Sequence, residues 1–356
     1  RDVIPFQSRK GFSMRHKKPL PALLVVLLDL LGIGAMLGIF ALVQLSPRAG
    51  SGQPLQSIVS KSTPAPASDQ SAAPESATTP DPAASAATSA TPEPTPTPAL
   101  GDFSARFPTD EPEEGADVVG SYADGDLRVV VSKKRSEDAT YFVADVWVRN
   151  IHGFKTAFAK GKFGRSLYEM PNDIANRLNA VVAISGDTYG SNSQSVVIRN
   201  GNLYRDTVGT EDICVLYSDG VMESYYANQF DLDAAIARGA YQTWAFGPKI
   251  LDNGQIPASY NTTDVIIAHN PRSAIGYFEP GHYCLVVVDG RQGDYSRGMT
   301  MDELAQTMID LGCVDAYNLD GGQSAMMIFQ GQIVSQPYKG GREISDIIYF
   351  GGSDPE

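Results

Sequence analysis

The sequence is poor in the residues that build metal sites and disulfide frameworks. It contains three cysteines and four histidines among 356 residues. Cys214, Cys284 and Cys313 lack the spacing of zinc ligands or of a disulfide scaffold, and the histidines form no metal-binding pattern. Cys284 and Cys313 stand among apolar residues and are predicted to be buried thiols. One disulfide among the three cysteines is left open, and the sequence argues against a zinc or histidine-based metal site.

Positive charge is also scarce. The chain has 28 Lys and Arg against 41 Asp and Glu, a formal net charge of −13. So acidic a chain repels nucleic acid, and we expect no nucleic acid partner. The sequence also lacks a Gly-x-Ser-x-Gly nucleophile elbow, a lysine-containing phosphate-binding loop and internal repeats. These absences exclude the hydrolase and nucleotide-binding classes that depend on those motifs.

Residues 1–19 are basic, and residues 20–45 form a long apolar stretch. The stretch is long enough to cross a bilayer at about 1.5 Å per helical residue, and the preceding positive charges favour a cytoplasmic N-terminus. These charges are Arg9, Lys10, Arg15, Lys17 and Lys18. We expect an uncleaved transmembrane anchor, although Asp29 is costly inside a membrane. A cleaved signal peptide is the alternative, and Met14 is an alternative start of the chain.

Residues 46–100 are rich in Ala, Ser, Thr and Pro, most clearly over residues 91–98. Such a segment buries too little apolar surface to fold, and its prolines keep it extended. We expect a disordered stalk that carries the rest of the chain outside a cell membrane.

Residues 101–356 are expected to fold as one β-rich domain of the α+β or mixed α/β class, with a mixed sheet. Segments rich in β-branched and aromatic residues predict strands. The expected strands include 127–132, 141–149, 181–184, 265–268 and 347–350. Asn-Gly at 200–201 and Asp-Gly at 219–220 predict two hairpins. Residues 171–178 and 231–238 are expected to be helical.

The C-terminal third predicts a strand, a crossover helix and a second strand. The apolar run 285–288 ends at Asp289, a capping box at Thr300 begins a helix, and the run 314–319 ends at Asp320. Two strands joined in this way are parallel, so their carboxyl ends lie at one edge of the sheet, where ligands collect. We expect Asp289 and Asp320 to share a site. In the alternative reading one of them only caps a loop.

The segment 317–324 places an acid, two glycines and a hydroxyl residue at the end of a strand. Glycines permit close approach of another group to the backbone, which suits a binding site. We therefore expect Asn318, Gly321, Gly322 and Ser324 to contact a substrate beside Asp320. An Asp-Gly turn between two strands is the alternative.

Three arginines stand near these strand ends. Arg272 follows the expected strand 265–268, Arg291 follows Asp289, and Arg342 precedes the last strand. Arginine binds phosphate and carboxylate through two parallel hydrogen bonds, so we expect an anionic substrate group. Surface salt bridges are the alternative reading.

Further segments of the domain form a recognisable series: 184–190, 197–201, 246–248, 270–276, 288–292, 296–300, 318–324 and 342–346. In these segments, and in their order, the domain resembles the phosphodiester glycosidase family. Together they are far more specific than any single motif. The chain departs from the family pattern at Ser185, where Asn is usual, and at Gln323, where Gly is frequent. Both changes fall in the expected site and leave the exact substrate open.

The resemblance implies hydrolysis of a sugar–phosphate diester at the anomeric carbon, through a transition state with oxocarbenium character. In this reading Arg272 and Arg291 bind the phosphate, and Arg342 is a weaker candidate. Asp320 is the nucleophile or base, and Asp289 is its partner or an orienting group. A carboxyl separation near 5 Å would indicate retention, and a wider gap inversion.

Asp187 and Ser324 are expected to contact sugar hydroxyls or a water molecule. The sequence requires no cofactor, and a divalent cation at the aspartates is left open. His269 and His282 are candidates for assisting proton transfer. The expected substrates are cell-wall glycopolymers or phosphodiester-linked exopolysaccharides. A non-catalytic carbohydrate-binding or wall-organising module is the main alternative function, and a transferase that builds such diesters is a further one.

Overall fold

A computed structural model describes residues 53–54, 101–112 and 115–355. The expected anchor and nearly all of the expected stalk lie outside the described residues. Within the part that is described, no helix has the length and apolar character needed to cross a membrane.

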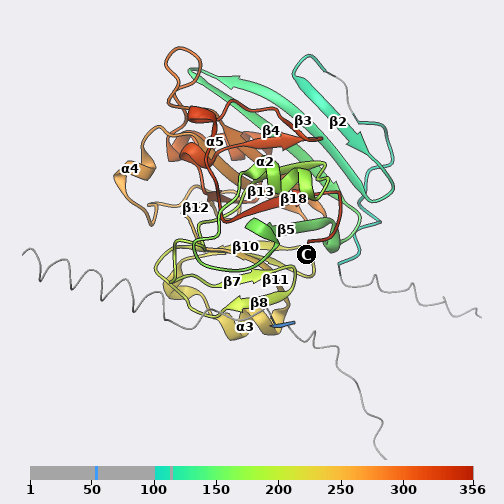
Figure 1. The fold of residues 1–356 in the computed structure, drawn as a ribbon, viewed down its shortest axis with the longest axis vertical. Coiled ribbons are helices and arrows are strands. Elements are labelled where there is room, and N and C mark those ends of the chain that lie inside the picture. The colour runs from blue at the N-terminus through green and yellow to red at the C-terminus, as the bar shows by residue number, and fades with distance from the viewer. Residues whose placement is uncertain (1–52, 55–100, 113–114, 356) are drawn as a thin grey trace, which may run out of the picture. The chain divides into compact units, whose positions relative to one another are not determined.

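Strands dominate the domain and α-helices are few, as the fold-class prediction stated (Figure 1). The first nine strands are β1 (Gln53–Pro54), β2 (Val118–Ala123), β3 (Leu127–Ser136), β4 (Ala139–Val148), β5 (Phe154–Phe158), β6 (Val182–Ser185), β7 (Val197–Arg199), β8 (Asn202–Arg205) and β9 (Ile213–Tyr217). The others are β10 (Met222–Tyr225), β11 (Ala240–Trp244), β12 (Lys249–Leu251), β13 (Arg272–Glu279), β14 (His282–Val288), β15 (Asp315–Leu319), β16 (Met327–Phe329), β17 (Gln332–Ile333) and β18 (Asp346–Phe350). The α-helices are α2 (Pro171–Arg177), α3 (Leu232–Arg238), α4 (Asp264–Ile267) and α5 (Met301–Leu311).

The largest sheet has seven strands in the order β12-β15-β13-β14-β4-β3-β2. Its hydrogen-bonded pairs are all antiparallel. Strands β14 and β15 are both antiparallel to β13, so they run in the same direction, as their crossover through α5 predicts. However, β13 lies between them. The two strands are therefore next-nearest neighbours, and the expected closeness of Asp289 and Asp320 is not imposed by strand pairing.

The packing of strand β14 on both of its faces explains why its sequence is apolar without a break. Cys284, Val286 and Val288 face the cluster that packs under α5, while Leu285 and Val287 face the opposite core. Successive side chains of a strand point to opposite faces. The seven-stranded sheet is thus covered on both faces, and an antiparallel strand acquires the pattern usually associated with buried parallel strands.

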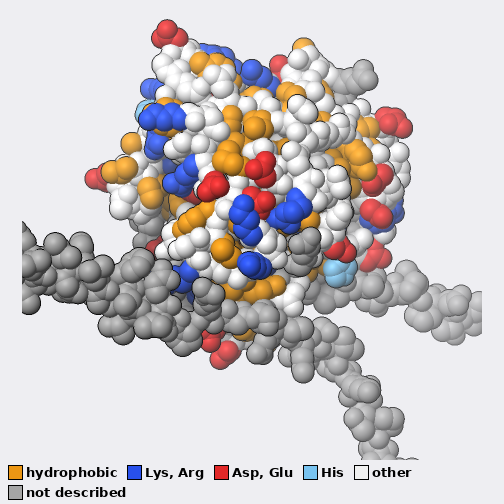
Figure 2. Space-filling model, in the orientation of Figure 1, with side chains coloured by type: hydrophobic (Ala, Val, Ile, Leu, Met, Phe, Trp, Pro, Cys, Tyr) orange, Lys and Arg blue, Asp and Glu red, His pale blue; other side chains and the backbone are white. Residues whose placement is uncertain are grey.

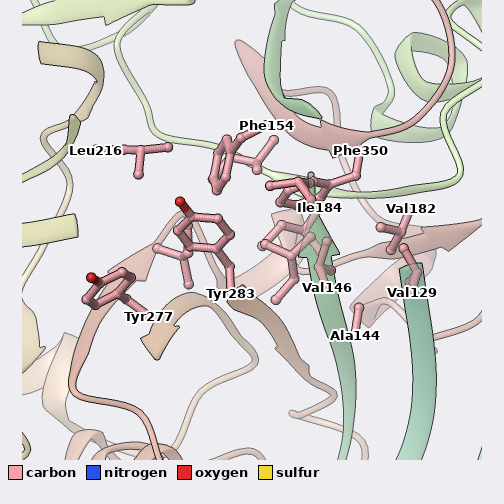
Figure 3. Packing of buried hydrophobic residues seen from close by; sticks show 14 of the residues in the cluster. Val129, Ala144, Val146, Phe154, Val182, Ile184, Leu216, Tyr277, Tyr283 and Phe350 are labelled. Carbon is pink, nitrogen blue, oxygen red and sulfur yellow. The ribbon is translucent and has the colours of Figure 1, made fainter. Parts of the chain in front are cut away.

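A second sheet, in the order β17-β16-β6-β18-β5, covers the other face of the first. The core between the two sheets includes Val129 and Val146 from the first sheet and Ile184 and Phe350 from the second (Figure 3). The outer face of the second sheet packs against α2, through Ile174 and its neighbours. The order of layers is therefore helix, sheet, sheet, helix.

Two smaller sheets, β10-β9-β11 and β1-β8-β7, complete the domain. In Figure 1 the strands β7, β8 and β11 and the helix α3 lie far from β2 and β3. The turn between β7 and β8 has positive φ at Asn200 (51°) and Gly201 (75°), which confirms the expected hairpin. The expected helix 231–238 is confirmed as α3, capped by Asp231 and ended by left-handed Gly239.

One expected strand is wrong. Residues 265–268 belong mainly to the short helix α4, which Thr263 precedes. A short apolar run such as Val-Ile-Ile has no periodicity that separates helix from strand. The strand that leads to the site begins only at Arg272.

The cysteines are buried and free, which confirms the buried thiols expected at Cys284 and Cys313. The Sγ atoms of these two residues lie 3.6 Å apart.

Near its middle, the face drawn in Figure 2 carries basic side chains beside acidic ones, with hydrophobic side chains scattered around them. Interspersed charges and scattered apolar groups are usual for a solvated surface.

Candidate active site

A cavity of about 270 Å³ opens where β15 ends and β13 begins. Its walls come from the loop after β15, from α4 and the start of β13, and from two more distant arginines. The lining residues are Phe246, Val265, Ile266, Asn270, Pro271, Arg272, Arg291, Asn318, Leu319, Asp320, Gly321, Gly322, Gln323 and Arg342. Segments far apart in the sequence thus meet around one carboxylate and three guanidinium groups.

Asp320 follows the last residue of β15 and is 5% exposed. Arg342 Nη2 lies 2.9 and 3.0 Å from its two carboxylate oxygens, and the Ser324 hydroxyl donates to Oδ2 at 2.6 Å. Burial raises the pKa of Asp320, and the Arg342 charge and the Ser324 hydrogen bond oppose that rise. The carboxylate is therefore desolvated but held in one orientation.

The two glycines after Asp320 bring its loop against the start of β13. A Cβ on Gly321 would lie 2.6 Å from the Pro271 carbonyl oxygen, and the Gly322 N–H donates to that same oxygen at 2.8 Å. Gly322 also has a φ of 62°, which favours glycine. The Gly-Gly pair fixes the distance between Asp320 and Arg272.

Arg272 is a buried cation, only 3% exposed. Its Nε donates to the Met299 carbonyl at 2.9 Å, and its Nη2 donates to carbonyls at the end of α4, including Ile266 and Ala268 at 2.6 Å. No described carboxylate forms a salt bridge with it. Burial, aided by the nearby Arg291, lowers the pKa of Arg272 to about 10.

Arg291 lies beside Arg272 and is likewise without a salt bridge to any described residue. Its Nη2 donates to Asn270 Oδ1 at 2.6 Å, and its guanidinium carbon lies 5.7 Å from the centre of the Tyr338 ring. A Cβ on Gly322 would be 3.6 Å from Arg291 Nη1. Two neighbouring guanidinium groups that form no salt bridge with a described carboxylate attract an anion strongly.

Asn318 presents an unused acceptor in the same cavity. Its Nδ2 donates to the Gly247 carbonyl at 2.7 Å, which fixes the orientation of the amide. Its Oδ1 is buried and has no hydrogen-bond partner among the described residues. An unpaired buried acceptor is costly, so the geometry suits a hydrogen-bond donor on a ligand.

Asp289 is not among the residues that line the cavity, contrary to the expectation of a shared site. The Gln336 N–H donates to both of its oxygens, at 2.9 and 3.0 Å, and the Tyr295 hydroxyl donates to Oδ2 at 2.9 Å. Burial raises the pKa of Asp289. Strand β13 separates Asp289 from Asp320 by two strand spacings, about 10 Å. The geometry matches the alternative reading, in which one acid holds a loop.

Asp187 lies in a buried ionic cluster next to the cavity. Arg199 Nη2 is 3.1 Å from Asp187 Oδ2 and 2.7 Å from Asp346 Oδ2. The Tyr189 and Ala245 N–H groups also donate to Asp187. Burial raises the pKa of Asp346 to about 7, although Arg199 opposes this.

Sequence reasoning did not single out Arg199 and Asp346 as parts of this region. The sequence did contain a signal for this ion pair. An arginine lies within the apolar strand 197–199 and an acid begins the apolar strand 346–350, and buried charges of opposite sign are expected to pair.

Ser185 connects the second sheet to the loop of Asp320. Its hydroxyl lies 2.8 Å from both the Ser273 hydroxyl and the Asp320 carbonyl oxygen, and the Asp320 N–H donates to the Gly186 carbonyl at 3.0 Å. The departure from Asn at 185 therefore affects the support of Asp320. At the other departure, Gln323 Nε2 donates to the Gly341 carbonyl at 2.8 Å.

The histidines considered for proton transfer lie elsewhere. His269 Nε2 is 3.2 Å from Glu303, and His282 Nε2 is 2.7 Å from Asp145. Neither lines the cavity. Across residues 101–112 and 115–355, no group of three or more His, Cys, Asp or Glu is arranged to hold a metal ion.

Two curated proteins resemble the chain. A SPbeta prophage-derived uncharacterised protein, YomE, from Bacillus subtilis (strain 168) is 32% identical over 182 residues, which are 49% of this chain and 28% of that protein. The N-acetylglucosamine-1-phosphodiester alpha-N-acetylglucosaminidase of Bos taurus is 36% identical over 66 residues, 18% of this chain and 12% of the enzyme. The chain thus matches less than a third of the length of each relative.

Solved structures give weaker likenesses. The zebrafish N-acetylglucosamine-1-phosphodiester alpha-N-acetylglucosaminidase catalytic domain, auto-inhibited by its pro-peptide, is 19% identical with a TM-score of 0.49, covering 63% of this chain and 82% of that one. A hypothetical protein from Synechocystis is 15% identical with the same TM-score, covering 63% and 62%.

The phosphodiester glycosidase family model matches residues 178–351, which include every residue that lines the cavity around Asp320. Residues 178–351 are therefore similar to the domain that defines the phosphodiester glycosidase family.

Proposed function

We propose that the domain hydrolyses glycosyl-1-phosphodiesters, cleaving the bond between the anomeric carbon and the phosphate oxygen. The observation that carries this proposal is one cavity that holds two arginines, which form no salt bridge with any described carboxylate, together with one desolvated, oriented carboxylate. The match of residues 178–351 to the phosphodiester glycosidase family model supports the same reaction class.

Arg272 and Arg291 bind the phosphodiester. Arg272 Nη1 has no hydrogen-bond partner in the described part of the chain, and Arg291 retains donors beyond the one used by Asn270. Their charges stabilise the phosphate as the bond to the sugar breaks and the phosphomonoester departs as an anion. A stable anionic leaving group needs little protonation, which accords with a cavity lined by a single carboxylate.

Asp320 acts on the anomeric carbon, as the base that takes a proton from the attacking water or as the nucleophile. Arg342 and Ser324 orient its carboxylate, which revises the role of Arg342 from phosphate ligand to positioning residue. Asp289 does not line the cavity, so it is not the second carboxyl group of a retaining or inverting pair with Asp320. Asp187 and Asp289 serve as supports for neighbouring loops.

Asn318 Oδ1 accepts a hydrogen bond from a sugar hydroxyl or amide, and Phe246 supplies an apolar wall of the same cavity. This contact satisfies the buried amide oxygen only when sugar is bound.

We also propose an extracellular, membrane-tethered location, with cell-wall or exopolysaccharide glycopolymers as substrates. The support comes from the basic, apolar and proline-rich segments of residues 1–100. Protease accessibility of residues 101–356 on intact cells tests this part, because a protected domain would contradict it.

The reaction is tested by incubating the full chain with a methyl phosphodiester of N-acetylglucosamine 1-phosphate, the substrate class in the name of the bovine relative. Release of free sugar and methyl phosphate, in equal amounts, supports the hydrolase. Binding without release in this and in the glucose and mannose analogues indicates a carbohydrate-binding module. Turnover only with an activated sugar donor indicates a transferase.

A further inference from the structure

A second and larger cavity, of about 690 Å³, lies outside the site around Asp320. It is formed by the loop before β9, the turn after β10 and the segment before α4. Its lining residues are Gly209, Thr210, Tyr226, Ala227, Asn228, Gln229, Ser259, Tyr260 and Asn261. We call this cavity the tyrosine groove.

The lining of the tyrosine groove is neutral. It contains two tyrosines, three side-chain amides and two hydroxyl residues, and none of its nine residues is charged. The active-site cavity, by contrast, has three arginines and an aspartate. Aromatic faces beside uncharged donors and acceptors suit sugar rings, whose C–H faces are apolar and whose edges carry hydroxyls.

Both tyrosines are held in place before any ligand arrives. The Lys249 ammonium lies 4.3 Å from the centre of the Tyr226 ring and is itself 2.7 Å from Asp252 Oδ2. Lys249 is buried, whereas Tyr226 is half-buried, so the ring has one face on the cation and an accessible part towards the groove. The Tyr260 hydroxyl donates to Asp302 Oδ1 at 2.8 Å. Rigid aromatic groups lose little conformational entropy on binding.

The tyrosine groove and the active-site cavity are separated by one hydrogen-bonded layer. Asn261 Nδ2 donates to Asp212 Oδ1 at 3.0 Å, and the Tyr317 hydroxyl donates to the Asp212 carbonyl. That hydroxyl accepts from the N–H of Phe246, at 3.1 Å, and Phe246 lines the active-site cavity. The segment 259–266 also contributes residues to both cavities.

We propose that the tyrosine groove binds uncharged sugar units of a substrate whose phosphodiester is held by Arg272 and Arg291. The inference rests on the proposed function for its catalytic part. It adds that the substrate is a glycan chain with neutral sugars beyond the cleaved linkage, because a single sugar phosphate leaves the groove empty.

The test measures binding of two kinds of probe to the full chain. Three neutral tetrasaccharides, built of glucose, mannose or N-acetylglucosamine, are titrated by ligand-observed NMR, and inorganic phosphate by calorimetry. At least one tetrasaccharide should bind to the unsubstituted chain. Tyr226→Ala should weaken this binding about tenfold or more, and Arg291→Gln should change it little. Phosphate binding, in contrast, should be weakened by Arg291→Gln and little changed by Tyr226→Ala.

Two further variants keep the test interpretable. Asn228→Ala removes an exposed amide of the groove and should weaken tetrasaccharide binding about threefold even if Tyr226→Ala destabilises the fold. Tyr122→Ala removes a tyrosine of β2 outside the groove and should leave binding unchanged.

Failure of all three tetrasaccharides to bind, or binding unaffected by both groove substitutions, overturns the proposal. Tetrasaccharide binding in a chain that hydrolyses no phosphodiester overturns the proposed reaction instead and leaves the groove as a glycan site.

Discussion

At the residue scale, the chemistry of Asp320 depends on a balance between burial and one partner. Burial raises the pKa of the carboxyl group, while Arg342 and Ser324 lower it. In the proposed reaction Asp320 acts as base or nucleophile and must be ionised, so we expect activity to fall as the pH drops through this raised pKa. The acidic limb of the rate profile therefore lies above the ordinary range of aspartate.

Replacing Arg342 tests that balance. Arg342→Gln removes a positive charge next to Asp320, so the pKa of Asp320 rises further and the acidic limb of kcat/KM moves to higher pH. Profiles of kcat/KM against pH for both proteins measure the shift. A limb that stays in place, or moves to lower pH, contradicts the assigned role of Arg342.

Replacing Arg291 tests the phosphate site. Arg291→Gln should raise KM for the phosphodiester about tenfold or more, since a charge-assisted hydrogen bond contributes about 1.5–3 kcal/mol. Arg297→Gln is the matched control, because Arg297 lies in the same loop but pairs with Glu303 at 3.0 Å. Equal effects of the two substitutions would count against a phosphate site at Arg291.

Much of the candidate site was predictable from single residues. Asp320, Asn318 and the three arginines line one cavity, since strand ends and glycine-rich turns mark positions that open onto an edge of a sheet. The environment of each side chain was not predictable. Whether an arginine meets a carboxylate, as Arg342 does, or carbonyls, as Arg272 does, depends on tertiary contacts that no local pattern contains.

At the element scale, the site depends on the close contact between the loop after β15 and the start of β13. Gly321→Ala would place a methyl group 2.6 Å from the Pro271 carbonyl, and backbone must move to relieve the clash. We expect a loss of about 1–3 kcal/mol of stability together with a large loss of activity.

Gly125→Ala is the matched control for that substitution. A Cβ at Gly125 meets no atom within 4 Å, and its φ is not positive. Thermal unfolding and activity of both variants, measured together, test the contact. A neutral Gly321→Ala variant would show that the loop has room to shift.

The elements also show where sequence patterns mislead. The unbroken apolar run of β14 indicated a strand buried on both faces, which is correct, but burial on both faces is compatible with antiparallel pairing when a second sheet and a helix cover the two sides. The sequence analysis predicted no strand over residues 272–279, so it missed the antiparallel strand β13 that lies between β14 and β15. The separation of Asp289 from Asp320 follows from that single strand.

At the scale of the whole molecule, two packed sheets with an outer helix on each side bury several ionisable groups away from the site. Asp315, at the start of β15, accepts a hydrogen bond from the Ser224 hydroxyl at 2.7 Å. Burial, with a smaller effect of Asp252, raises its pKa to about 7.

This carboxyl group predicts a pH dependence of stability. Because the folded-state pKa is raised, the contribution of Asp315 is fully present below the unfolded-state value near 4 and is lost as the pH rises through 7. Asp315→Asn retains the acceptor for Ser224 and should flatten the fall in stability between pH 4 and 7, by up to about 1.4 kcal/mol per pH unit. Denaturant unfolding at a series of pH values checks this. An unchanged slope would mean that Asp315 is not protonated in the folded protein.

The β-rich class was predictable for the whole domain because strand propensity, turn residues and the capping box of α5 agree with one another. The number and stacking of sheets were not, since pairing between distant strands leaves no local signal. The anchor and stalk expected within residues 1–100 stay predictions.

The central claim is that Asp320 performs the chemistry while Arg272 and Arg291 hold the phosphate. Its most direct test compares the full chain with Asp320→Asn on the methyl phosphodiester of N-acetylglucosamine 1-phosphate. The account predicts that the unsubstituted chain releases free sugar, and that the variant binds inorganic phosphate within about threefold of it but loses a factor of about 10³ or more in kcat. Hydrolysis retained by the Asp320→Asn variant would contradict the account.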